Sequence, residues 1–282
     1  YLIDYLTRIG GLNIPYIGPI KPWQAVFLIA GLPGLLLSAM VFLLPEPARP
    51  LALVSPAKTA FGKDLWLHLV AHRTTLVPMF SGLIFMAIIF YSFSAWAPTM
   101  MVRTYAISLA EAGMMLGILT IVCSITGTIL AGIAVDRLSA LGYRDAPVRA
   151  AMFVCLLAMP PIVMAPLMES LTLAWVLLGF YLLFISAYAT LGLLAVSGVA
   201  SAHVKGQMTA VFALLMMIFS STLGPQLTAF FTDFVFADES KLNWSVSLTG
   251  ALALPVAAVF FRASIPHYAR SVERLDDKHS AV

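Results

Sequence analysis

The stretch AGMMLGILTIVCSITGTILAGIAVDR, residues 112–137, decides what kind of fold this chain adopts. Residues 112–135 contain no Asp, Glu, Lys or Arg, and the run ends on the charged pair Asp136-Arg137. A helix of this length is about 36 Å long, whereas the hydrocarbon core of a bilayer is about 30 Å thick. We therefore predict that this segment crosses a membrane and that the charged pair marks the point where it leaves.

Six other segments share this pattern, and the 282-residue chain is 61% hydrophobic and only 10% charged. A helix that is apolar all round must be buried on every side, so repeated charge-free spans indicate an all-α, polytopic membrane protein. The net charge of +3 comes from scattered residues and provides no basic face for nucleic acid. The seven predicted spans are Trp23 to Leu44, Pro78 to Met101, Ala112 to Val135, Ala150 to Met168, Leu171 to Ala200, Met208 to Thr232 and Trp244 to Phe261.

The positive charges are divided unequally between the two sides of these spans. Of the 16 Lys and Arg residues, 12 fall in connections on one side and 4 on the other. Lys and Arg accumulate in short cytoplasmic loops, so we expect the first side to be cytoplasmic. The protein is then a multi-pass protein of the cell membrane, with the start of this chain outside and the C-terminus in the cytoplasm.

The longest connection, residues 45–77, opens with prolines that stop the preceding helix and then carries Leu65 and Leu69 at helical spacing. We predict a short amphipathic helix that lies along the membrane surface. His68 and His72 are four residues apart, a spacing that allows two imidazoles to bind one metal ion. Because no third ligand lies nearby in the sequence, we predict no metal site.

Two other kinds of protein compete with a carrier. Seven-span receptors have an acidic-Arg pair at the cytoplasmic end of the third span, where Asp136-Arg137 falls, but Pro255 is followed by Val-Ala-Ala instead of completing an Asn-Pro-x-x-Tyr pattern. A membrane-embedded enzyme is the third possibility. The sequence holds no Gly-rich phosphate loop, nucleophile elbow or paired catalytic carboxylates, so we predict neither an enzyme nor a cofactor.

The segment Gly132-Ile133-Ala134-Val135-Asp136-Arg137 resembles the Gly-x-x-x-Asp-Arg signature of the major facilitator superfamily. In that family a copy follows the eighth helix, which makes the third span here the equivalent of that helix. WQAVFLIAGLPG at 23–34 and LLPEP at 43–47 resemble the sixth helix and its exit. WAPT at 96–99 and EAG at 111–113 resemble the branch of spinster-like transporters and anion:cation symporters. The signature departs from the family pattern after the Arg, because the next Gly and basic residue come only at Gly142 and Arg144.

The resemblance implies that the chain holds the sixth to twelfth helices of a twelve-helix fold. Residues 1–22 would be the end of the preceding helix and an external loop, 23–44 the last helix of the N-terminal bundle, 45–77 the interdomain loop, 78–261 the C-terminal six-helix bundle and 262–282 a cytoplasmic tail. Because the chain starts at Tyr1 without a methionine, we expect that its beginning is missing, and the resemblance implies about five more helices upstream.

The implied function is secondary active transport of a small organic solute by alternating access between two bundles. The implied partners are the lipid bilayer, the N-terminal bundle of the same chain and a coupling ion, H⁺ or Na⁺, as in a symporter. Proton coupling normally uses a carboxylate inside the membrane. None lies inside the predicted spans, so we expect that residue in the upstream half.

In the family the seventh, eighth, tenth and eleventh helices line the substrate cavity, and these correspond to the second, third, fifth and sixth spans. Polar groups are costly in lipid, so those inside a span should face a cavity or a neighbouring helix. Hydroxyls, an amide and aromatic rings suit a partly apolar organic substrate, although Ser and Thr also join packed helices. The predicted cavity residues are Tyr91, Ser92, Trp96, Tyr181, Tyr188, Thr222 and Gln226.

Five residues are predicted to serve conformational change. Asp136, flanked by Gly132 and Arg137, is expected to pair with the positive N-terminus of a helix in the other bundle in one closed state. Gly224 and Pro225 loosen the sixth span beside Gln226 and predict a gating bend, with a static kink as the alternative. A ridge of small residues in the third span is expected to be a close-packing face, made of Gly113, Gly117, Thr120, Ser124, Gly127 and Ala131.

Overall fold

The computed structural model describes Arg8 and residues 12–14, 18–43, 62–201 and 204–280. The chain divides into a unit of residues 1–58 and a unit of residues 59–282, and each is described by itself. Within the first unit, strands β1 (Leu12–Ile14) and β2 (Gly18–Ile20) pair antiparallel, with Leu12 opposite Ile20. This hairpin was not predicted and is a short exception to the all-α class. The predicted helix end at Leu44, the proline-rich exit after it and the rest of 45–61 lie outside the described residues.

The first span is helix α2 (Pro22–Val41), which follows β2 directly. Proline suits the first helical position because that position needs no N–H donor for the helix. The Gln24 side-chain oxygen accepts a hydrogen bond of 3.0 Å from the Lys21 amide just before the helix. Most apolar side chains of α2 are exposed within their own unit, as Leu35 is at 72%. A span that meets lipid or other helices has this character.

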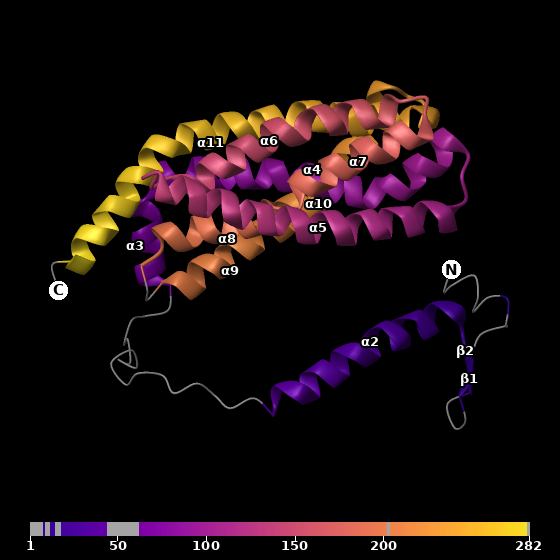
Figure 1. The fold of residues 1–282 in the computed structure, drawn as a ribbon, viewed down its shortest axis with the longest axis horizontal. Coiled ribbons are helices and arrows are strands. Elements are labelled where there is room, and N and C mark those ends of the chain that lie inside the picture. Colours follow the sequence, from indigo (N-terminus) through magenta and orange to yellow (C-terminus); the bar gives the residue numbers. More distant parts are fainter. Residues whose placement is uncertain (1–7, 9–11, 15–17, 44–61, 202–203, 281–282) are drawn as a thin grey trace. The chain divides into compact units, whose positions relative to one another are not determined.

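The second unit is a bundle of helices whose long axes run side by side (Figure 1). In its first helix, α3, the side chains of Leu65 and Leu69 are partly buried against the core, while Trp66 and Leu67 are exposed. In chain order the elements are α3 (Lys63–Ala71), α4 (Arg73–Tyr105), α5 (Leu109–Ala140), α6 (Ala146–Met164), η2 (Ala165–Leu167), α7 (Leu171–Ile185), α8 (Tyr188–Val199), α9 (Lys205–Leu215), η3 (Met216–Ser220), α10 (Ser221–Phe230), η4 (Phe231–Val235), η5 (Glu239–Lys241) and α11 (Leu242–Ser280).

Seven helical segments of the described residues are long and apolar enough to cross a membrane. They match the seven predicted spans one for one, so the all-α membrane fold is confirmed apart from the hairpin. Three of the helices, α4, α5 and α11, extend beyond the charge-free runs at both ends, and these extensions include charged residues. In the third span Ser108 begins α5 by accepting a hydrogen bond from the Glu111 amide, and the Glu111 carboxylate lies in the positive first turn.

Helix α11 packs along α4 and α6, α10 packs on α4, and α5 packs on α7. The centre of the bundle is filled by long apolar side chains such as Met79, Met86 and Ile89 of α4. Gly82 lets the Phe261 ring of α11 reach the α4 backbone, because a Cβ at residue 82 would lie 2.9 Å from the ring. Among the spans of this second unit, α5 has the smallest buried share, so much of its surface is left for contacts outside the unit.

Two spans depart from regular α-helix along their length, besides the short 3-10 turns η2 and η5 at the ends of two others. The predicted span from Leu171 to Ala200 is divided at Ser186, whose hydroxyl bonds back to the Leu182 carbonyl at 2.6 Å, a contact that bends helices. In the sixth span π-helical turns η3 and η4 precede and follow α10. Such turns occur often at functional sites.

Candidate functional site

The contact between α4 and α10 is unusually close, and we call it the α4–α10 seam. A Cβ on Gly224 would lie 2.5 Å from the Ile88 carbonyl oxygen, so only glycine allows the two backbones to approach in this way. About two turns further along α4, the Trp96 indole donates a 3.0 Å hydrogen bond to the Pro225 carbonyl. The predicted gating pair, Gly224 and Pro225, therefore lies in a helix-packing contact between two π-helical turns.

A chain of buried hydroxyls continues this seam into α11. Ser92 of α4 is hydrogen-bonded to Thr228 of α10, and Thr228 is bonded at 2.8 Å to Thr249 of α11. Thr249 in turn donates to the carbonyl of Ser245. Hydroxyls buried in a membrane bundle are satisfied by neighbouring helices in this way. The Ser92 side chain, predicted to line the cavity, is buried in this chain instead.

Tyr181 is also buried, although it was predicted to share a cavity-facing surface with Tyr188. Its hydroxyl donates a 3.2 Å hydrogen bond to the Ile89 carbonyl of α4. Its ring meets the Phe93 ring edge-on, with centroids 4.9 Å apart. Tyr181 therefore joins α7 to α4, and its surroundings in this structure are those of a packing residue.

Tyr188 lies differently, because the break at Ser186 ends α7 and Tyr188 begins α8. Its half-buried ring lies 4.7 Å from the Phe90 ring and 6.4 Å from the Tyr91 ring, measured between centroids. We call these three residues the aromatic cluster. The structure thus brings together two of the predicted residues, Tyr91 and Tyr188, from spans nearly a hundred residues apart in sequence.

Thr222 and Gln226 are exposed and one helical turn apart on α10. Both lie on the side of α10 that the seam leaves uncovered, since Gly224 and Thr228 of the same helix are buried. An exposed amide within a membrane span is costly unless it faces water or a polar partner. These two residues therefore share an open surface but have no described contact with the aromatic cluster.

A hollow between α4 and α5 adjoins the aromatic cluster and was not predicted. Phe90 and Ser94 line it from α4, and Gly117 and Thr120 line it from α5. Thr120 and Gly117 had been assigned to the close-packing ridge. That assignment fits only the other half of the ridge, where a Cβ on Gly127 would lie 1.9 Å from the Leu183 carbonyl oxygen. Thr120 and Ser124 are the two polar members of this ridge, and the Thr120 hydroxyl was the sequence signal for the hollow.

At the end of α5, Asp136 and Arg137 are exposed, and Gly132 is half-buried one turn before them. Within the described residues neither charged side chain forms an ion pair, whereas nearby Arg149 pairs with Asp145 at 2.8 Å and Arg144 with Glu273 at 3.5 Å. Asp136 and Arg137 are therefore open to a partner outside this unit.

At the opposite end of the bundle, hydrogen bonds from the Ser240 hydroxyl and amide hold the pKa of Asp238 below its ordinary value.

The two histidines of α3 face other elements of the bundle. His68 is hydrogen-bonded to the Val199 carbonyl at 3.0 Å, and His72 contacts the Ser271 hydroxyl at 3.4 Å. Their rings lie 4.5 Å apart. Among the described residues, no three His, Cys, Asp or Glu side chains come together as a metal site would need. These contacts join α3 to α8 and α11.

Comparison with known sequences identifies relatives for this chain. The model of the Major Facilitator Superfamily matches residues 6–225. An "MFS-type efflux pump" of Mycolicibacterium smegmatis is 25% identical over 272 residues, which cover 93% of this chain and 61% of that protein. The chain therefore spans about three-fifths of the length of this relative.

Comparison with solved structures points to the same fold. The crystal structure of a bacterial homologue of the human lysosomal transporter Spinster, inward-facing and unoccupied, matches with a TM-score of 0.60 and 18% identity, over 98% of this chain and 64% of that one. The inward-facing, occupied structure matches with a TM-score of 0.54 and 20% identity, over 96% and 63%. At these identities the likeness concerns the fold alone.

Proposed function

The chain belongs to the major facilitator superfamily, and from that premise we propose that it is the larger part of a secondary active transporter that moves a small organic solute by alternating access. The family favours this function over a seven-span receptor, for which Asp136-Arg137 was the main argument. A membrane-embedded enzyme has no support from the side-chain arrangement of the described residues. The observation that carries the proposal is the polar and aromatic surface that α4, α5, α8 and α10 leave uncovered.

Tyr91 and Tyr188, with Phe90, form the aromatic wall of the proposed solute site. Ser94 and Thr120 supply hydroxyls in the hollow beside it. Such groups are tolerated in a span only when they face water, solute or another helix, and here they lie on the open side of the bundle. Stacking surfaces with a few hydroxyls suit a partly apolar, neutral organic solute.

Thr222 and Gln226 add a second exposed polar surface on α10, and Trp96 lies at the seam beside it. Gln226 supplies both a donor and an acceptor, which suits a solute that carries hydroxyl or carbonyl groups. We assign Trp96 a supporting role, because its indole N–H is already used by the Pro225 carbonyl. Ser92 and Tyr181 are left out of the proposed site, since both are buried between helices.

The proposed coupling ion, H⁺ or Na⁺, is held outside the described spans. Asp233 is exposed near the end of its span, in η4, and the described middle of the membrane segments carries no other Asp or Glu. A proton-coupled carrier normally uses an embedded carboxylate. We therefore propose that the upstream helices provide the coupling site together with the rest of the solute cavity.

We propose that Asp136 closes one side of the transporter by pairing with a helix N-terminus of the other bundle. Its carboxylate is exposed at the end of α5 and open to such a partner. Gly132, one turn before it, faces open space within this unit, which leaves room for a helix of the other bundle. Gly224 and Pro225 form the second conformational element, in which α10 moves along α4.

We propose that the protein lies in the cell membrane with its C-terminus in the cytoplasm. Figure 1 places α3, the end of α8, the start of α9 and the C-terminal end of α11 at one end of the bundle. The α5–α6 connection, with Arg137 and Arg144, belongs to the same end, because α5 runs back from the α4–α5 connection. Positive residues mark the cytoplasmic side.

The test is uptake of a panel of organic anions, sugars and lipids by the complete protein in sealed vesicles. Tyr188→Ala should raise the half-saturating concentration of the transported solute at least severalfold, because it removes one wall of the aromatic cluster. Trp66→Ala, which removes an exposed aromatic side chain of α3, is the control and should leave uptake unchanged. Failure to transport any solute of the panel, or equal uptake by both variants, would contradict the proposed site.

A further inference from the structure

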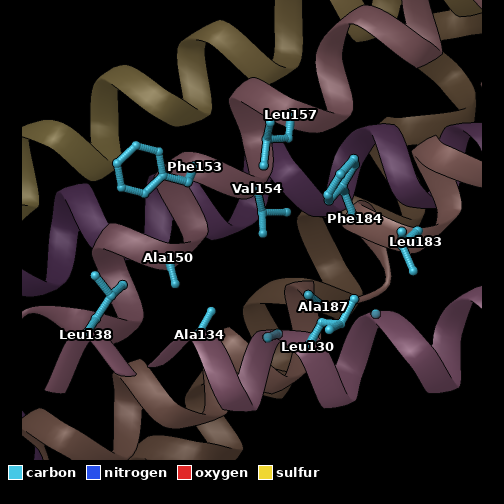
Figure 2. A pocket seen from close by; sticks show the side chains of 12 residues that line it. Leu130, Ala134, Leu138, Ala150, Phe153, Val154, Leu157, Leu183, Phe184 and Ala187 are labelled. Atoms are coloured by element: carbon cyan, nitrogen blue, oxygen red, sulfur yellow. The ribbon is translucent and has the colours of Figure 1, made fainter. Parts of the chain in front are cut away.

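An apolar groove opens between α5 and α6, with α7 as its floor (Figure 2). Every residue that lines it is Gly, Ala, Val, Leu or Phe. The side chains at its rim are about half exposed, at 49% for Leu130, 47% for Phe153 and 52% for Leu157, so the groove is open along its length. An open and wholly apolar surface within a membrane span is suited to contact with lipid chains.

The groove has the length of one lipid leaflet. Its α5 wall runs from Gly127 to Leu138, a rise of about 16 Å at 1.5 Å per residue. Half of a hydrocarbon core of about 30 Å is about 15 Å. Because Leu138 lies at the charged end of the helix, the groove reaches from the membrane surface to about the midplane.

A cationic side chain stands at the surface end of this groove. Arg137 follows Leu130 and Ala134 by seven and three residues, so it lies on the flank of the helix face that lines the groove. Asp136 is two residues on from Ala134 and lies on the opposite side of the helix. The neighbouring carboxylate therefore points away from the groove mouth, while the Arg137 guanidinium can reach it.

The other two arginines near the mouth are already engaged. Arg149 is paired with Asp145 and lies over the Tyr143 ring, 4.3 Å from its centroid. Arg144 is paired with Glu273. Among the described residues Arg137 has no ion pair, and an exposed guanidinium at the membrane surface binds phosphate oxygens well.

We propose that this groove holds one acyl chain of an anionic phospholipid whose phosphate group lies against Arg137. The leaflet is that of the α5–α6 connection, which is cytoplasmic if the proposed orientation of the transporter holds. The apolar walls match the chain, and the positive charge at the mouth matches the headgroup. The site is distinct from the aromatic cluster, because the two have no residue in common.

The two parts of the site make different contributions. A lipid chain gains little hydrophobic free energy on entering the groove, because it leaves an equally apolar medium. The apolar walls therefore determine only whether an acyl chain fits into the groove. The preference for one lipid over another depends on the headgroup. A cation at a membrane surface favours an anionic lipid by a factor of about five, or about 1 kcal/mol.

The experiment measures the lipid that the complete protein retains. The protein is reconstituted into vesicles of phosphatidylcholine with a minor share of phosphatidylglycerol, extracted in mild detergent, and its bound lipids are counted by native mass spectrometry. Wild-type protein should retain phosphatidylglycerol in excess over its bulk share. Arg137→Gln should lower that excess about fivefold, whereas Lys205→Gln, an exposed cation at the start of α9, should leave it unchanged.

A second pair of variants tests the groove itself. Ala134→Leu places a larger side chain in the groove and should reduce lipid retention severalfold, while Ala213→Leu, on the exposed surface of α9, should not. An unchanged phosphatidylglycerol excess in Arg137→Gln, or unchanged retention in Ala134→Leu, would overturn the proposal. Lipid retention is measured without transport. A failure of the lipid-site proposal is therefore distinguishable from a failure of the proposed transport function.

Discussion

Replacing Gly224 with alanine tests the α4–α10 seam most directly. The new Cβ would lie 2.5 Å from the Ile88 carbonyl oxygen and 3.1 Å from the Ser92 amide nitrogen, both backbone atoms that cannot rotate away. To reach ordinary contact at 3.4 Å, the two helices must separate by about 0.9 Å. A separation of that size breaks the 3.0 Å hydrogen bond from Trp96 to the Pro225 carbonyl.

The expected free-energy change combines three effects. Overpacking a close contact costs about 1–3 kcal/mol, and the lost hydrogen bond costs about 0.5–1.5 kcal/mol. Alanine recovers about 0.5–1 kcal/mol of helix propensity over glycine. The matched control is Gly179→Ala on α7, where the nearest atom to the new Cβ is Leu119 Cδ2 at 3.6 Å. The control gains the same propensity without the clash, so the two variants should differ by roughly 2–4 kcal/mol.

The assay is unfolding of the complete protein in mixed micelles, with sodium dodecyl sulfate as the denaturant and helical circular dichroism as the signal. Gly224→Ala should unfold at a clearly lower fraction of sodium dodecyl sulfate than Gly179→Ala. Uptake into vesicles then shows whether the weakened seam also alters turnover. Equal midpoints for the two variants would refute the close approach of α10 and α4 on which the argument rests.

Three other predictions concern the same seam and the end of α5. Trp96→Phe should lower the free energy of unfolding by about 1 kcal/mol more than Trp175→Phe in the same unfolding assay, because both variants lose the same ring area and Trp96→Phe also loses the donor to the Pro225 carbonyl. Pro225→Ala should lower the transport rate more than the folded yield, and unchanged turnover would contradict a gating role for this bend. Asp136→Asn should shift the balance between inward-open and outward-open states, measured by labelling of single cysteines, and an unshifted balance would contradict the proposed pairing.

The spans could be predicted because the cost of a charge in lipid leaves a direct mark on the sequence. The run at 112–135 is charge-free, and α5 extends past it only by polar ends such as the Ser108–Glu111 turn. The break at Ser186 left no comparable mark, because a serine inside a span bonds back to its own helix without interrupting the apolar pattern. The β1–β2 hairpin was not predicted either, and it pairs only three residues in each strand.

The site could be predicted only in part, for a physical reason. In water an exposed face is polar, but in a bilayer the outer surface is as apolar as the core, so hydropathy does not separate buried from exposed faces. Ser92 and Tyr181 were therefore indistinguishable in sequence from Tyr188, although the structure buries them between helices. The grouping of Tyr188 with Tyr91 depends on the direction in which α8 begins after the break. A helical periodicity in the sequence does not predict that direction.

The buried hydroxyls of the seam have a fixed order of protons. Thr249 gives its proton to the Ser245 carbonyl, so Thr228 must donate to Thr249 and Ser92 must donate to Thr228. Hydroxyl dipoles aligned head to tail strengthen one another. Because Thr228 is the middle member, a shift of α10 along its axis disturbs two bonds at once, one to each neighbouring helix. Helix α10 is thus held in the position that the structure shows, because any shift along α4 and α11 must first break both bonds.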